Sequence, residues 1–262
     1  MSTILSVYCT DKNKLIQAQA FAEKNNFAFT DTLTSDTPLC LNFDLDLPEL
    51  SDTSNQSAIH IDFTGGGLAH RLQFGGGKGQ TIAKAVGISS KNKPHILDAT
   101  AGLGRDALVL ANLGCQLSLV EQSPVLYEML TQAKHIASDD PLFNQATQKG
   151  FSIYHNNAVA FMKEKTIPDC DVVYMDPMYP EKKKSALVKK DMQILQKLLG
   201  HSTENQIADL LETALKFAKQ RVVVKRPKGA DNIRGIKPTM SLNSKKTRYD
   251  IYVIKAMMPL SV

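Results

Sequence analysis

A short segment behind an apolar run carries residues that could bind and orient an amino group. Residues 172–175 (VVYM) are apolar and are followed by Asp176, Pro177, Met178 and Tyr179. A carboxylate accepts hydrogen bonds from an amine, a proline has no N–H to donate, and an aromatic ring can stack on a flat base. This set suits an enzyme that methylates an exocyclic amino group of a nucleobase. The alternative is that Asp176 merely ends a strand before a turn proline.

A second segment has the features of a nucleotide-binding turn. Residues 98–106 (DATAGLGRD) lie between an apolar run and an apolar helix pattern, and they include Gly102 and Gly104. Glycines permit a tight turn, and the free N–H groups of a helix start can face a ligand. Glu121 ends the next apolar run, where a carboxylate can accept hydrogen bonds from ribose hydroxyls.

This turn is compatible with two kinds of cofactor. The dinucleotide pattern Gly-x-Gly-x-x-Gly is met only with Ala107 at its third glycine position, which the pattern tolerates. The glycine pair alone is therefore a weak signal. Combined with Glu121 and with the segment 176–179, it favours S-adenosylmethionine over a dinucleotide.

The chain after residue 94 alternates between strand and helix patterns. Gly114 supplies a helix stop, and apolar residues recur at helical spacing behind Pro124. Such alternation predicts an α/β fold with a doubly wound, mostly parallel sheet of the Rossmann type. The predicted strands are 95–100, 116–121, 151–155, 171–175, 221–225 and 249–254, and the predicted helices are 105–113, 124–137, 185–199 and 205–218.

The beginning of the chain follows a different pattern. Residues 1–64 predict a small N-terminal α/β domain, residues 65–93 a glycine-rich joint with a helix, and residues 94–262 the larger domain. The joint holds two glycine triplets, which are either flexible linkers or loops that approach a ligand closely. Within residues 1–64 we expect strands at 4–9, 27–30, 39–43 and 59–63, a helix at 11–24 and a loop at 51–57.

The composition argues against several classes of protein. No apolar stretch approaches the roughly 18 residues of a membrane span, and the first residues lack the basic start and longer apolar run of a signal peptide. The four cysteines are far apart, and the six histidines show no metal-ligand spacing. We therefore expect a cytoplasmic protein with reduced cysteines, no membrane contact and no metal.

The net charge of +5 is distributed unevenly along the chain. Basic residues exceed acidic ones in residues 178–262, whereas acidic residues exceed basic ones in residues 1–177. A basic half suits a polyanionic partner such as nucleic acid, although charge runs are also ordinary solvated surface. Lysines at 182–184 and 189–190, with Lys225 and Arg226, flank the segment 176–179, so we expect them to contact phosphates.

Several long stretches give the chain a resemblance to a known family. The chain resembles the ribosomal small-subunit methyltransferase J family within the Rossmann-type methyltransferases. One position differs from the wider group of amino-methyltransferases: this chain has Met178 where their Asp-Pro-Pro-Tyr motif has a second proline. The stretches are FTGGGLAHRLQFGGGKGQTIAKAVG (63–87), LDATAGLGRDALVLANLGC (97–115), VVYMDPMYPEKKKSALVKKDM (172–192), RVVVKRP (221–227) and RYDIY (248–252).

The resemblance implies a set of site residues. As catalytic residues it points to Asp176, which would accept a hydrogen bond from the amine, and to Tyr179, which would stack on the base, or failing it Phe74. For Asp106 the alternative is a helix-start acid that complements the helix dipole, and for the asparagine pair it is a turn after a strand. The implied cofactor contacts are Arg105, Asp106, Glu121, Gln122, Asn156, Asn157 and Asp176, and the glycine turn itself adds Gly102.

The resemblance also implies an activity, which is transfer of a methyl group from S-adenosylmethionine to N2 of a guanine in 16S ribosomal RNA. Its partner would then be the RNA of the small ribosomal subunit, free or assembled. Two alternatives stay open from the residues themselves. One is methylation of another amine, in DNA or a protein glutamine, and the other is a catalytically silent RNA-binding module.

Overall fold

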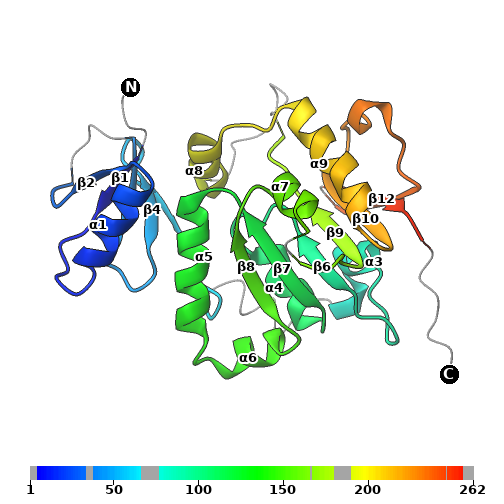
Figure 1. Ribbon diagram of the computed structural model, residues 1–262, viewed down its shortest axis with the longest axis horizontal. Coiled ribbons are helices and arrows are strands. Elements are labelled where there is room, and N and C mark those ends of the chain that lie inside the picture. Colours follow the sequence, from blue (N-terminus) through cyan, green and yellow to red (C-terminus); the bar gives the residue numbers. More distant parts are fainter. Residues whose placement is uncertain are drawn as a thin grey trace.

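The computed structural model describes residues 5–33, 38–65, 77–165, 167–179, 190–245 and 247–255. It contains two β-sheets that lie side by side (Figure 1). The smaller sheet has the order β2-β1-β3-β4-β5 and carries helix α1 (Leu15–Lys24). Its strands are β1 (Leu5–Tyr8), β2 (Ala28–Thr30), β3 (Leu39–Asn42), β4 (Glu49–Asp52) and β5 (Ser57–His60).

The smaller sheet confirms a strand–helix unit at the start of the chain, with one difference. The expected loop at 51–57 is instead the tip of an antiparallel hairpin, in which Leu50 pairs with Ile59. The polar composition of the segment concealed β4, because its outward residues are polar whereas Leu50 and Asp52 are buried. Polar residues can alternate with buried ones on a half-buried strand.

The larger sheet has the order β11-β12-β10-β9-β6-β7-β8. Its five strands from β8 to β10 run parallel, and β12 pairs antiparallel with β10 and with β11. The predicted Rossmann-type sheet is therefore confirmed. The strands are β6 (His95–Asp98), β7 (Gln116–Glu121), β8 (Phe151–His155), β9 (Val172–Met175), β10 (Arg221–Pro227), β11 (Met240–Asn243) and β12 (Thr247–Val253).

Helices cover both faces of the larger sheet (Figure 1). Among the described helices, none is long and apolar enough to cross a membrane. The helices, with the short 3-10 turns η1 and η2, are η1 (Gly77–Gly79), α3 (Thr81–Val86), α4 (Arg105–Asn112), α5 (Pro124–Ala137), α6 (Pro141–Thr147), α7 (Ala158–Lys163), α8 (Lys190–Leu199), α9 (Glu204–Phe217) and η2 (Ile233–Gly235).

Alternation along the buried strands divides the interior into two apolar clusters. On β9, Val172 and Tyr174 belong to one cluster, while Val173 and Met175 belong to the other. The first cluster includes α3, α4 and α5 and continues into the smaller sheet, whereas the second includes α7 and α9. Successive side chains of a strand point to opposite faces, so a continuous apolar run serves both clusters.

Helix α8 connects the two sheets. It packs against β5 and β4 of the smaller sheet, and Figure 1 shows it between the two parts of the molecule. The Lys197 ammonium nitrogen lies 2.7 Å from an Asp52 carboxylate oxygen and 3.2 Å from the Ser54 hydroxyl. The Asp52 side chain is only 5% exposed, and the ammonium of Lys197 helps to lower the pKa of this carboxyl against the effect of burial.

We predict that Lys197→Met destabilises the protein by about 1–3 kcal/mol, because it leaves the buried Asp52 carboxylate without its cation. Chemical denaturation at neutral pH measures this change. The matched control is Lys14→Met, whose partner Asp46 has a 96% exposed side chain, so we expect a loss below about 1 kcal/mol. Equal losses in the two variants would contradict the role given to Lys197.

Candidate functional site

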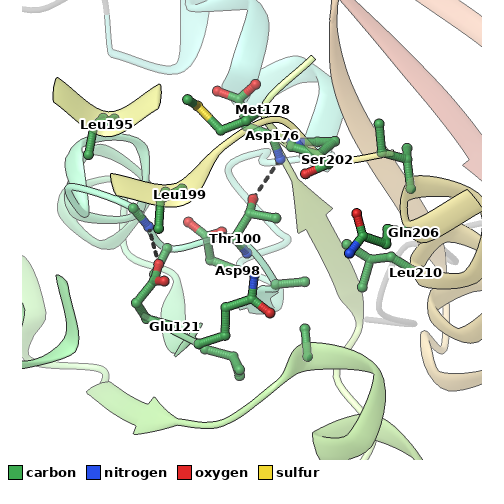
Figure 2. Close-up of a pocket in the computed structure, with 18 of the residues that line it drawn as sticks. Asp98, Thr100, Glu121, Asp176, Met178, Leu195, Leu199, Ser202, Gln206 and Leu210 are labelled. Carbon is green, nitrogen blue, oxygen red and sulfur yellow. Dashed lines mark hydrogen bonds between the residues drawn. The ribbon is translucent and has the colours of Figure 1, made fainter. Parts of the chain in front are cut away.

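A pocket of about 830 Å³ opens at the carboxyl ends of β6, β7 and β9 (Figure 2). In open α/β sheets this edge is where ligands bind, and the volume is within the range of small-molecule sites. Side chains from α8, from α9 and from the loop between them form the opposite wall; in Figure 2 these include Leu195, Leu199 and Gln206.

The floor of the pocket is the turn between β6 and α4. Gly102 and Gly104 have φ angles of +54° and +68°, which residues with a side chain rarely adopt. A Cβ atom on Gly104 would lie 2.9 Å from Leu130 and 3.1 Å from Phe63. Glycine at 104 therefore permits both the turn and its packing against the segment that follows β5.

Glu121 ties the ends of the first two parallel strands together. Its carboxylate oxygens accept the backbone N–H of Gly102 at 2.9 Å and of Ser123 at 2.8 Å. Burial raises the pKa of this carboxyl, while the N–H bonds oppose the rise. A carboxylate has about four acceptor sites, so two bonds leave capacity for the hydroxyls of a ligand.

Asp176 lies across the pocket from Glu121, at the end of β9. Its backbone N–H donates to the Thr100 hydroxyl at 2.7 Å (Figure 2), which fixes the strand end against the β6 turn. Its carboxylate lies 2.7 Å from the Lys225 ammonium nitrogen. Burial raises the pKa of the Asp176 carboxyl, and Lys225 acts in the opposite direction.

Lys225 also reaches Asp106, which lies in the first turn of α4. The ammonium nitrogen is 2.8 Å from an Asp106 carboxylate oxygen, and the Tyr174 hydroxyl donates to the same oxygen at 2.8 Å. The sequence pattern predicted a phosphate contact for Lys225, whereas in the structure its side chain is engaged by two carboxylates in the pocket. The sequence did indicate an inward-facing side chain, because side chains alternate along β10 and Lys225 therefore lies on the same face of the sheet as the buried Val223.

Asp98 is a fourth carboxyl group at this edge, and we did not place it among the site residues from sequence. Its side chain is buried and accepts the backbone N–H of Thr100 at 3.1 Å. Burial raises its pKa to about 7, and the neighbouring carboxylates of Asp106, Asp176 and Glu121 add to the rise. The group therefore titrates close to neutral pH.

The polar residues after β7 and β8 bond to one another. The Asn157 side-chain oxygen accepts the backbone N–H of Val159 and Ala160 and so caps α7, and its amide donates to Gln122 at 3.1 Å. Asn156 accepts the backbone N–H of Asn157 at 2.7 Å. The alternative of a turn after a strand thus describes Asn157, whose side chain accepts the backbone N–H two residues on, and Gln122, Asn156 and Asn157 all line the pocket.

Arg105 crosses the mouth of the pocket. Its guanidinium donates to the Asp191 carboxylate of α8 at 2.9 Å, and both side chains are substantially exposed. Sequence reasoning missed α8 and α9 as pocket walls, since helical periodicity does not say where a helix packs. In α9, Gln206 closes a capping box with Thr203 and also lines the pocket.

Tyr179 lies outside the lining of the pocket and packs against the second apolar cluster. The guanidinium carbon of Arg226 is 5.0 Å from the centre of its ring. Arg226 is buried, so the expected surface contact of Arg226 with phosphate is not what the structure shows. Lys190, another expected phosphate contact, is exposed at the start of α8. The expected contacts at 182–184 and 189 and the ring of Phe74 lie outside the described residues.

The described residues hold no group of three or more His, Cys, Asp or Glu side chains that could bind a metal. The four carboxyl groups of the pocket accept hydrogen bonds from backbone N–H groups, from Tyr174 and from Lys225, and Glu121 retains acceptor sites. This arrangement suits hydrogen bonding to an organic ligand.

Comparisons with known proteins identify the family and the fold of the chain. A family model for SAM-dependent methyltransferases matches residues 21–254. A crystal structure of a SAM-dependent methyltransferase from Neisseria gonorrhoeae superimposes with a TM-score of 0.73 at 28% identity, covering 98% of this chain and 97% of that chain.

Similar proteins of known name indicate which family of methyltransferases the chain belongs to. The ribosomal RNA small subunit methyltransferase J of Colwellia psychrerythraea is 47% identical over 79% of this chain and 74% of its own. The protein of the same name from Vibrio vulnificus is 41% identical over 97% of this chain and 99% of its own. Given this similarity and a pocket at the expected strand ends, the chain belongs to the ribosomal RNA small subunit methyltransferase J family of SAM-dependent methyltransferases.

Proposed function

We propose that this protein transfers a methyl group from S-adenosylmethionine to the exocyclic N2 amine of a guanine in 16S ribosomal RNA, in the cytoplasm. The observation that carries the proposal is the joint presence of Glu121 and Asp176 in one pocket, on strands that flank β6. One carboxylate suits the ribose of a nucleoside, and the other suits an amine.

The residues of the pocket fit this cofactor. Glu121 retains acceptor sites for ribose hydroxyls, and Gly102 lets the backbone approach a ligand closely. Gln122 and Asn156 offer amide groups that can donate and accept at the edge of an adenine. When bound, S-adenosylmethionine supplies an electrophilic methyl group on a sulfonium. We further propose contacts from Arg105 and Asp106, which border the same space.

Asp176 is the residue we assign to the amine. The lone pair of a guanine amine is delocalised into the ring, so the amine is a weak nucleophile. An ionised carboxylate that accepts an amine hydrogen gains interaction energy as positive charge develops on the nitrogen, which favours the transition state. Thr100 and Lys225 hold Asp176 in place for this bond.

Tyr179 is the residue we assign to the extruded base. Enzymes that modify a base must first take it out of its stack, and an aromatic ring can replace the lost stacking. Tyr179 follows Met178, which lines the pocket, and Arg226 packs over its ring. Its position outside the pocket lining means that the base would meet it at the edge of the site.

The test of the function is to map methylated nucleotides of 16S RNA by mass spectrometry in cells with and without the protein. The expected result is loss of one N2-methylguanine, restored by the wild-type gene. Transfer of labelled methyl groups in vitro to small subunits, free RNA, DNA or protein separates the alternatives. Label in DNA or protein alone would reject the RNA assignment, and no label in any substrate would support a silent binding module.

We predict that Glu121→Gln weakens S-adenosylmethionine binding by about 1.5–3 kcal/mol, the scale of a hydrogen bond to a charged group. Isothermal calorimetry measures the affinity. The control is Glu128→Gln on α5, which bonds Gln17 and Gln132 away from the pocket and should bind as wild type. Wild-type affinity in Glu121→Gln would remove the ribose role.

We predict that Asp176→Asn lowers turnover on the order of 100-fold or more while leaving RNA affinity nearly unchanged, because it removes an ionised acceptor from the transition state. Single-turnover methyl transfer measures the chemical step. The control is Asp169→Asn, which precedes β9 at the opposite edge of the sheet and should keep full activity. Near-normal turnover of Asp176→Asn would show that the carboxylate is not needed.

A further inference from the structure

We infer that Lys225 is a positioning residue that keeps Asp176 ionised and directs one of its oxygens toward the methyl acceptor, with Asp106 and Tyr174 as its anchor. The inference deepens the proposed function and rests on it. It concerns a residue that the sequence pattern suggested for phosphate binding.

The geometry around Lys225 is a bridge between two structural elements. Its ammonium nitrogen lies 2.8 Å from Oδ2 of Asp106 and 2.7 Å from Oδ2 of Asp176, and its side chain is 23% exposed. Asp106 comes from α4 and Asp176 follows β9. The ammonium therefore holds the carboxylate at the end of β9 at a set place relative to the turn and helix that follow β6.

The ion pair of Lys225 with Asp106 has more support from neighbouring groups than its ion pair with Asp176. Oδ2 of Asp106 accepts both the Lys225 ammonium and the Tyr174 hydroxyl, and its side chain is 19% exposed. The Asp176 side chain is 39% exposed, facing the pocket. Because the bond from Lys225 goes to Oδ2 of Asp176, it leaves Oδ1 to accept an amine hydrogen.

The positive charge of Lys225 also favours the ionised form of the Asp176 carboxyl, because it lowers the pKa of that group. Charged and titratable groups of the neighbouring elements act on Asp176: Asp98 of β6, Asp106 of α4, Tyr174 of β9, Tyr179 after it and Lys225 of β10. Arg105 of α4, Asp191 of α8 and His201 after α8 line the same pocket. The carboxylates of Asp98 and Asp106 both repel that of Asp176, and repulsion between carboxylates favours protonation. A protonated carboxyl would lose the charge on which stabilisation of a developing ammonium depends.

The first experiment uses the protein without cofactor or RNA. The carboxyl carbons of aspartate are labelled, and the Asp176 signal is assigned by its absence in Asp176→Asn. In Lys225→Met we expect the pKa of Asp176 to rise by about one unit or more, which is about a tenfold change in its proton affinity. Lys225→Arg retains a cation and should remain near wild type, and Lys219→Met, before β10, should match wild type.

The second experiment follows methyl transfer against pH. The acidic limb of the turnover profile should move to higher pH in Lys225→Met, by the same amount as the Asp176 titration, and activity should recover in part at alkaline pH. Lys225→Arg should restore the wild-type limb. The salt dependence of RNA affinity should stay unchanged, whereas a phosphate contact would lower the slope by about 0.7–0.9.

The outcomes separate this inference from the proposed function. If wild type methylates 16S RNA but Lys225→Met shows an unchanged Asp176 titration and an unchanged pH limb, the inference fails and the function stands. A reduced salt slope with an unchanged titration would assign Lys225 to phosphate instead and also overturn it. If wild type transfers no methyl group to RNA, the proposed function fails, while the titration still tests the coupling of Lys225 to Asp176. Lys225→Gln, which also removes the charge, provides the same test if Lys225→Met does not fold.

Discussion

A single ammonium group allows two carboxylates to lie side by side at the centre of this protein's site. Buried or partly buried carboxylates repel one another, and one of a close pair normally takes up a proton. The bonds from Lys225 to Asp106 and Asp176 offset this repulsion. These bonds hold together the end of β9, the strand β10 and the start of α4. The distances between these three elements set the shape of the pocket.

The smaller sheet contributes to the site indirectly, through the packing of its neighbours. Phe63, which follows β5, packs beside Gly104 of the turn between β6 and α4, and α8 carries both the Lys197 bond to Asp52 and the pocket residue Leu195. The first apolar cluster runs continuously from β1 and β3 to α4 and α5. A change in the packing of the smaller sheet would therefore alter the pocket at two places, the turn between β6 and α4 and helix α8.

The sequence was most informative where local rules determine structure. The alternation of strands and helices after residue 94 predicted the parallel sheet, because a parallel connection needs a crossover. Gly102, Glu121 and Asp176 were predicted to gather at one edge, and they line one pocket. Each of these positions follows from chain direction alone.

What the sequence did not reveal depended on long-range packing. A lysine after three valines is compatible with a solvated strand end, and only the approach of α4 shows that Lys225 meets Asp106. The short helices α6 and α7 were not predicted, since six or seven residues carry too little periodicity. Asn157 has a capping role that depends on where α7 begins, and the ring of Tyr179 contacts Arg226, which is distant in the sequence.

The buried carboxyl of Asp98 makes this fold a proton acceptor. Its pKa is near 7 in the folded protein, against an ordinary value of about 3.9 in an unfolded chain. Folding therefore takes up a proton between about pH 4 and pH 7, and stability contributed by the neutral group is progressively lost as the pH rises through that window. Near neutral pH the Asp98 carboxyl is still protonated in a fraction of the molecules. A cation that settles beside Asp98 favours the ionised form and releases that fraction to the solvent, which links occupancy of the pocket to the acidity of its surroundings.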